Sequence, residues 1–298
     1  MKRILIIGGC GYIGTRLYDE LSIDNKVDSM DTEWFGCSVR DNMPMDYRYI
    51  LPAMLATYDV VILLAGHSSV KMCEKKSKDT MLNNFSNFIG LVEKLEALDK
   101  PVKFIYASSS SVASGYNGNG YSPSNAYDLS KFMIDTAIEL YKKIDFYGLR
   151  FGSLGGFSRN MRKELMVNSM VISSIENGEF HVSGGMNNRP ILGMSDLVRA
   201  IRVLVESGRH PGIYNLASFN KSVNEIGKKV SEVMDVPIVH KDYPPSPYDF
   251  NIDCDKFCKT FNFTFTDTIE SIAKELVDNY GTMSMGDRNT PREYNYGF

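Results

Sequence analysis

A tyrosine and a lysine four residues apart, Tyr127 and Lys131, form the clearest catalytic pattern in the chain. Four residues make about one turn of a helix, so the phenol and the ammonium group share one helical face. The ammonium charge favours the phenolate, and we expect it to lower the tyrosine pKa from about 10 toward neutral pH. Tyr127 could then exchange a proton with a hydroxyl or carbonyl group of a substrate.

Hydroxyl side chains precede this pair: residues 108–111 are four consecutive serines at the end of an apolar stretch. Open α/β sheets bind ligands at the carboxyl ends of their strands, so one of these serines can hold the reacting oxygen. Alone, a tyrosine and a lysine at this spacing also fit an amphipathic helix with an exposed lysine. The serine-bearing strand before them makes acid–base catalysis the better interpretation.

A glycine-rich segment, Gly8, Gly11 and Gly14, lies between an apolar stretch and a helical pattern. Glycine permits a tight turn, close approach of a pyrophosphate and close packing of helix on strand. The helix that follows offers unpaired N–H groups, and we expect Tyr12 and Ile13 to contribute to this anion site. The segment therefore predicts a dinucleotide-binding loop rather than a purely structural turn.

A carboxylate, Asp31, follows 17 residues after Gly14, at the end of the second expected strand. A carboxylate there accepts hydrogen bonds from the adenosine-ribose hydroxyls and repels a 2′-phosphate. Thr32, Glu33 and Trp34 come next, with no base among them. We therefore predict NAD rather than NADP as the cofactor, with Tyr127 and Lys131 also contacting its nicotinamide ribose.

Strands must alternate with helices to position these groups. We predict strands at 3–7, 26–30, 60–64, 102–107 and 145–150, with helices at 15–23, 80–98 and 126–142. This alternation is typical of a doubly wound parallel sheet, the Rossmann arrangement, with a smaller C-terminal substrate-binding lobe. We place residues 1–151 and roughly 190–218 in the NAD-binding domain. The lobe takes roughly 152–189 and 219–280, with a helix at 161–177 and a strand at 179–182, and 281–298 form a tail.

Composition excludes several classes of protein. The net charge of −3 gives no basic field for nucleic acid, and no apolar run is long enough to span a membrane. The five cysteines are odd in number and lack paired spacing, so we expect reduced thiols and a cytoplasmic location. Cys254 and Cys258 have no second ligand pair, so we predict no metal site.

Together these features resemble the extended short-chain dehydrogenase/reductases, the NAD-dependent epimerase/dehydratase family, over roughly residues 1–280. The resemblance also covers the segments 59–66, 149–152, 167–170 and 188–196. It implies that Ser109 is the catalytic serine beside Tyr127 and Lys131, and that the protein forms a homodimer. It also implies that Asp46 faces the adenine, that Ala65 and Asn84 line the cofactor channel, and that Asn168 and Arg189 contact a nucleotide diphosphate.

The chain departs from these relatives at several positions. Ser110 and Ser111 replace the Asp-Glu pair with which family 4,6-dehydratases perform elimination, so dehydration is disfavoured. Tyr248 stands where many relatives have an arginine, which leaves the nucleotide open. His67 is either a polar substrate contact or an inert loop histidine, and we interpret Asp196 as a helix N-cap.

We predict a sugar-nucleotide epimerase that oxidises its substrate to a transient keto sugar and reduces it again. The alternative is an NAD(P)H-dependent reductase of a 4-keto sugar nucleotide, which uses the same residues. A non-catalytic NAD-binding protein is a third interpretation. Such a protein usually lacks the catalytic tyrosine or lysine, and this chain has both.

Overall fold

The computed structural model describes residues 1–298 except 118–119, 242–247 and 285–298. Its centre is a seven-stranded parallel sheet in the order β12-β8-β5-β4-β1-β2-β3. These strands are β1 (Arg3–Ile7), β2 (Lys26–Met30), β3 (Asn42–Met43), β4 (Val60–Leu63), β5 (Lys103–Ser109), β8 (Asp145–Phe151) and β12 (Gly212–Leu216). The predicted doubly wound sheet is confirmed, and the strand order reverses direction between β1 and β4.

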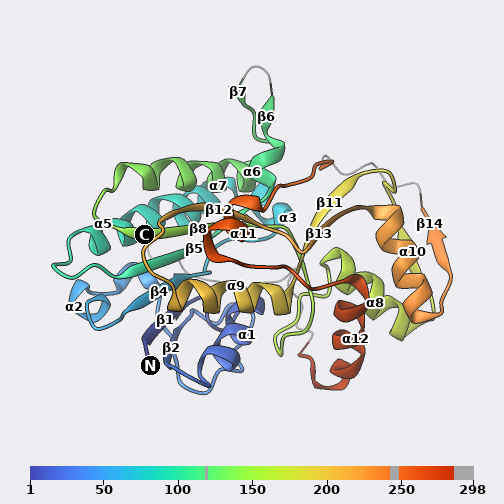
Figure 1. The fold of residues 1–298 in the computed structure, drawn as a ribbon, viewed down its shortest axis with the longest axis horizontal. Coiled ribbons are helices and arrows are strands. Elements are labelled where there is room, and N and C mark those ends of the chain that lie inside the picture. The colour runs from blue at the N-terminus through green and yellow to red at the C-terminus, as the bar shows by residue number, and fades with distance from the viewer. Residues whose placement is uncertain (118–119, 242–247, 285–298) are drawn as a thin grey trace.

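Both faces of the sheet are buried, which explains why its strands are continuous apolar runs in the sequence. In β1, Ile4 and Ile6 belong to one hydrophobic cluster, whereas Leu5 and Ile7 belong to the other. The first cluster packs against α1 (Tyr12–Leu21) and α9 (Met194–Glu206), and the second against α5 (Asn87–Glu96) and α7 (Ala126–Ala137). Figure 1 shows these two pairs of helices on opposite sides of the sheet.

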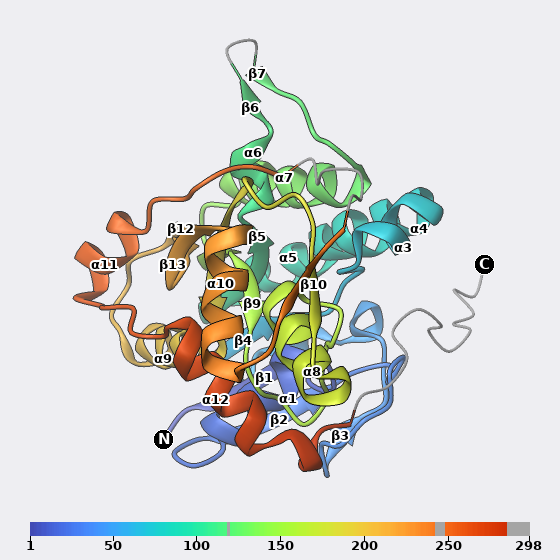
Figure 2. The same ribbon diagram turned by 90° about the vertical axis from the view of Figure 1, so that its right-hand side faces the viewer.

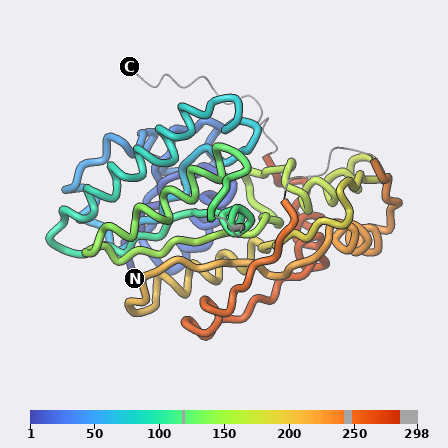
Figure 3. Tube along the Cα trace, turned by 90° about the horizontal axis from the view of Figure 1, so that it is seen from above, coloured from blue at the N-terminus to red at the C-terminus, as the bar shows by residue number. Residues whose placement is uncertain are grey.

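A smaller group of elements lies beyond the carboxyl ends of the main strands (Figures 1 and 2). It holds a three-stranded sheet, β13 (Phe219–Ser222), β11 (Asn188–Gly193) and β9 (Ser153–Gly155), and the pair β10 (Phe180–Val182) and β14 (Ile238–His240). The helices α8 (Met166–Asn177), α10 (Val223–Met234) and α12 (Ile269–Asp278) pack on one another there, apart from the main sheet in Figure 3. The domain bounds stay a prediction.

Shorter elements connect these parts. The helices are α2 (Pro52–Leu55), α3 (Val70–Lys75), α4 (Ser77–Met81), α6 (Ser111–Ser114) and α11 (Asp255–Phe261), and β6 (Tyr116–Asn117) pairs with β7 (Gly120–Tyr121). Single turns are η1 (Tyr47–Tyr49), the π-helical η2 (Leu82–Ser86), η3 (Ile138–Leu140) and η4 (Tyr280–Thr282). Within the described parts of the chain, no helix is long and apolar enough to cross a membrane.

Asp196 does not cap a helix, contrary to the prediction. Helix α9 begins at Met194 with Gly193 as its N-cap, so Asp196 lies inside the first turn. Its buried carboxylate accepts hydrogen bonds from the Ser218 hydroxyl at 2.6 Å and from the backbone N–H groups of Thr266 and Asp267 at 2.9–3.0 Å. Asp196 therefore fastens the segment before α12 to the start of α9.

Candidate active site

The glycine loop between β1 and α1 is shaped for close approach of a ligand. Gly8 has a φ of +91°, and a Cβ on it would lie 2.5 Å from the backbone nitrogen of Ala65. A Cβ on Gly14 would lie 2.1 Å from the carbonyl oxygen of Gly8. Helix α1 begins after Gly11 with no side-chain cap and no acidic residue in its first turn, so its N-terminus can receive phosphate groups.

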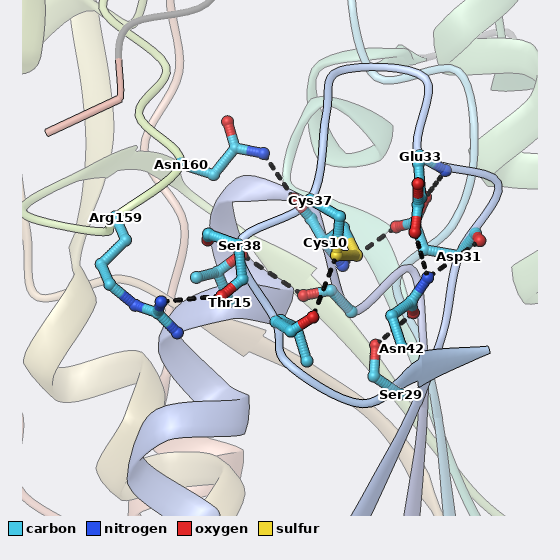
Figure 4. Close-up of a disulfide and its surroundings, with 12 residues drawn as sticks. Cys10, Thr15, Ser29, Asp31, Glu33, Cys37, Ser38, Asn42, Arg159 and Asn160 are labelled. Atoms are coloured by element: carbon cyan, nitrogen blue, oxygen red, sulfur yellow. Dashed lines mark hydrogen bonds between the residues drawn. A yellow bond between two sulfur atoms is a disulfide. The ribbon is translucent and has the colours of Figure 1, made fainter. Parts of the chain in front are cut away.

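Asp31 lies at the end of β2 with its carboxylate fixed by two backbone donors (Figure 4). One oxygen accepts from the N–H of Cys10 at 3.1 Å, and the other accepts from the N–H of Glu33 at 2.7 Å. Asp31 lines the same pocket as Gly8, Gly11 and Gly14. This arrangement suits a ribose and a pyrophosphate bound together, and the contacts of the carboxylate with the ribose and of the glycine loop with the phosphates remain predictions.

Most of the pocket wall comes from the segments after β1, β2, β3 and β4, at the reversal of strand order, and Leu154 of β9 and Arg162 complete it. Most of the residues predicted to contact the cofactor line this pocket. Among them, the Asp46 carboxylate accepts hydrogen bonds from the backbone N–H of Arg48 at 2.8 Å and from its side-chain Nε at 3.0 Å. The lining residues are Ile7, Gly8, Gly11, Tyr12, Ile13, Gly14, Met30, Asp31, Thr32, Trp34, Phe35, Met45, Asp46, Tyr47, Leu64, Ala65, Gly66, Ser68, Asn83, Leu154 and Arg162.

Asn84 lies behind this lining. Its side-chain oxygen accepts from the N–H of His67 at 2.7 Å, and its amide donates to the carbonyl of His67 at 3.0 Å and to the Ser130 hydroxyl at 3.1 Å. His67 is 1% exposed, with Nδ1 3.1 Å from the Thr80 hydroxyl, and burial lowers its pKa to about 4. Asn84 thus holds the loop that carries His67. The contact of Asn84 with the cofactor remains a prediction.

The predicted catalytic residues converge from β5 and α7. Helix α7 begins after Asn125, whose side chain accepts from the Asp128 N–H at 2.9 Å, and this start places Tyr127 and Lys131 one turn apart. The ammonium of Lys131 lies 5.8 Å from the centre of the Tyr127 ring and donates to the carbonyl of Ala107 at 2.7 Å. Ser109 ends β5 with its hydroxyl 2.8 Å from that of Ser111.

The pKa of Tyr127 differs from our expectation. Burial raises it to about 12, although a hydrogen bond from Ser109 and the charge of Arg162 act in the opposite direction. Burial also lowers the pKa of Lys131 to about 8, partly offset by Asp135. The prediction was wrong for the protein groups alone because the cost of burying the charged phenolate is the largest influence on the pKa of Tyr127. Tyr127 is therefore a phenol until a further positive charge enters the site.

The two predicted diphosphate contacts lie in different surroundings. Asn168 is fully buried, accepting from the N–H of Gly156 at 2.9 Å and donating to the Tyr12 hydroxyl at 3.1 Å. Arg189, on β11, lies 5.4 Å from the centre of the Tyr248 ring, and burial lowers its pKa. Asn168 joins the glycine loop to the smaller lobe, so it would have to give up one of these bonds to reach a ligand. Both contacts stay predictions.

Two features of the site, an arginine and a disulfide, were not predicted from the sequence. Arg162 lines the pocket and influences Tyr127, yet it precedes α8 in a segment without a recognisable motif. Cys10 and Cys37 form a disulfide, with an S–S distance of 2.00 Å. The expectation of reduced thiols was therefore wrong for this pair. The separation of 27 residues gave no signal, because the contact arises only when the segment after β2 folds back on the glycine loop.

The fold and the site together define a dinucleotide-binding enzyme with a tyrosine–lysine pair at the carboxyl ends of a doubly wound sheet. Residues 4–217 match the model of the NAD dependent epimerase/dehydratase family, and the chain belongs to this family. Its cofactor is NAD, which the glycine loop and Asp31 fit.

Solved structures share the fold at low sequence identity. An NAD-dependent NDP-hexosamine 5,6-dehydratase, TunA, superposes with a TM-score of 0.82 and 19% identity, over 96% of this chain and 100% of that one. UDP-glucose 4-epimerase from Thermotoga maritima gives 0.81 and 19%, over 94% and 98%. UDP-N-acetylglucosamine 4-epimerase from Methanobrevibacter ruminantium gives 0.80 and 21%, over 93% and 99%. No curated protein sequence matches the chain.

Proposed function

We propose that the protein epimerises a nucleotide-linked sugar through a transient keto intermediate. The observation that carries this proposal is the catalytic group itself: Ser109, Tyr127 and Lys131 offer one acid–base centre, and none of the three carries a carboxylate for elimination. Ser110 and Ser111 are buried hydroxyls where the family's 4,6-dehydratases have acids. The buried carboxylate on α7, Asp128, is held by the Tyr248 hydroxyl at 3.0 Å and by Asn125 at 3.0 Å.

The residues would act as follows. Bound NAD supplies the acceptor, and later the donor, of the hydride. Tyr127 would act as the phenolate that a further positive charge in the site favours: it would take the proton of the sugar hydroxyl while Ser109 holds that oxygen, and would return the proton when the carbonyl is reduced. Lys131 keeps a positive charge beside the phenol and is itself aligned by the Ala107 carbonyl. Because the proton and the hydride both return, the sugar nucleotide is the only compound that changes.

The substrate class is proposed from the smaller lobe and from the names of similar structures. Arg189 and the Tyr248 ring form a cation–π pair that can receive a diphosphate and a base, respectively. Two of the similar structures are epimerases named for UDP-sugars, and a third acts on an NDP-hexosamine. A homodimer that packs through the helices carrying Asn84 and Tyr127 stays part of this proposal.

The test is incubation with a panel of nucleotide sugars, with and without added NAD or NADH. NMR identifies the product and absorbance at 340 nm follows the cofactor. We expect many equivalents of epimer for each equivalent of NAD and no net change in absorbance. Consumption of one NADH or NADPH for each product formed from a keto sugar would establish the reductase instead.

A further inference from the structure

The disulfide lies at the border of the cofactor pocket. Cys10 belongs to the glycine loop and is 2% exposed, and its N–H donates to the Asp31 carboxylate that faces the ribose site. Cys37 ends the segment that follows β2 and is more exposed than Cys10. In Figure 4 the two sulfurs lie beside Asp31, Glu33 and Asn42 on one side and Asn160 on the other. The bond therefore joins the phosphate loop to the next loop of the site.

We call residues 32–37 the strap. It begins where Asp31 and Asn42 hold the backbone and side chain of Glu33, at 2.7 and 3.1 Å, and it ends at the disulfide. Within the strap, Thr32, Trp34 and Phe35 line the pocket. The ring of Trp34 reaches the loop after β4, with its centre 5.2 Å from that of His67.

The strap thus contacts the glycine loop at Cys37 and the loop after β4 at Trp34, and both loops line the cofactor pocket. Glu33, with a φ of +59°, and Gly36, with a φ of +78°, turn the backbone sharply at both ends of the Trp34–Phe35 pair. Beyond the disulfide, the Ser38 carbonyl accepts from the exposed Arg159 at 2.8 Å. The disulfide is the covalent bond that keeps the far end of the strap on the glycine loop.

We propose that Cys10 and Cys37 form a thiol–disulfide exchange site that sets the residence time of NAD. With the bond intact, the strap stays over the pocket and NAD leaves slowly. With both thiols reduced, the strap can open and NAD exchanges quickly. The inference goes beyond the proposed function, because it concerns the cofactor and holds whether the sugar is epimerised or reduced.

The exchange reaction uses a small thiol or a dithiol protein as reductant. Its thiolate attacks the more exposed sulfur of Cys37, forms a mixed disulfide there and expels Cys10 as a thiolate, which takes a proton from solvent. A second thiol then attacks the reductant's sulfur and releases Cys37. Two protein thiols and one oxidised reductant result, with two electrons and two protons transferred, and oxidation by a small disulfide runs the same steps backwards.

The test measures NADH dissociation without any sugar present. Enzyme loaded with NADH is mixed with excess NAD, and the loss of energy transfer from Trp34, the chain's single tryptophan, is followed in a stopped-flow instrument. Samples are equilibrated with oxidised or reduced dithiothreitol, and alkylation with mass spectrometry verifies the state of both cysteines. We expect dissociation at least tenfold faster after reduction.

Three variants separate this mechanism from general unfolding. Cys37→Ser should release NADH at the fast rate under both conditions, while Cys258→Ser, which removes a free thiol on α11, should behave like the unmodified protein. Trp34→Ala, followed by nicotinamide fluorescence, should release quickly with its disulfide intact. Circular dichroism melting should show that each variant remains folded. Equal rates in fully reduced and fully oxidised enzyme, or free Cys10 and Cys37 thiols after equilibration with oxidised dithiothreitol, would overturn the proposal.

Discussion

Acidification should destabilise the protein through His67. This histidine is buried behind the pocket lining, between the lining residues Gly66 and Ser68. Its ring lies next to Trp34 and Thr80, and its backbone is held by Asn84. Burial lowers its pKa from 6.5 to about 4, so the folded protein resists protonation that the unfolded chain accepts. The unfolded state therefore binds more protons between about pH 4 and 6.5, and stability falls as the pH falls through that window.

The magnitude follows from the size of the shift. At about 1.4 kcal/mol for each pKa unit, the complete effect is about 3 kcal/mol, reached when the folded state also begins to take up the proton. By pH 5 the unfolded histidine is almost fully charged and the folded one is not. We therefore expect the free energy of unfolding to be about 2 kcal/mol lower at pH 5 than at pH 8 from His67 alone.

Urea unfolding at a series of pH values, followed by Trp34 fluorescence, measures this loss. Other groups titrate in the same range, so the comparison is with His67→Gln, which keeps a polar side chain without the titration. The pH dependence of the variant should be shallower by about 2 kcal/mol, whatever its absolute stability. Parallel curves for the two proteins would show that His67 is not kept neutral by burial and would refute the reasoning.

Three further predictions concern the site. Tyr127→Phe should keep the fold and NAD affinity but lose roughly 10² to 10⁴ in turnover, measured by NMR of the product, and near-normal turnover would remove Tyr127 from the mechanism. Asp31→Asn should weaken NAD binding roughly 10- to 100-fold and bring NADP affinity closer to it, as measured by calorimetry, because the charged acceptor for the ribose is lost. Gly14→Ala should abolish measurable NAD binding, since its Cβ meets the Gly8 carbonyl, whereas Gly90→Ala on α5 has open space and should bind NAD normally.

The sheet was predictable because its strands are buried on both faces. Arg3–Ile7 and Lys26–Met30 were predicted with their observed bounds, since an apolar run followed by glycine or by an acidic residue ends clearly. Helix bounds were less accurate: α1 begins at Tyr12 rather than 15, because Gly11 acts as its N-cap. The region 80–98 is divided by the π-helical turn Leu82–Ser86, which periodicity alone does not reveal.

Within the site, the motifs predicted which strands and helices hold the catalytic and binding residues. They did not predict which hydrogen-bond partners those side chains have. Asn168 shows this limit, because its amide binds the nearby Gly156 and also Tyr12, which lies 156 residues away in the sequence. The pKa of Tyr127 depends on burial, which spacing does not report. The strap and its disulfide arise from two loops brought together by the adjacent parallel strands β1 and β2. The predicted tail, 281–298, lies mostly outside the described residues.

The fate of a deuterium label tests the proposed epimerisation most directly. Once NMR has identified the inverted carbon, substrate carrying deuterium at that carbon is converted over many turnovers with catalytic NAD. Oxidation and reduction within one site predict that the product retains deuterium at the same carbon, and that Tyr127→Phe slows its formation. Exchange of the label with solvent, or one NADH consumed for each product, would contradict the account.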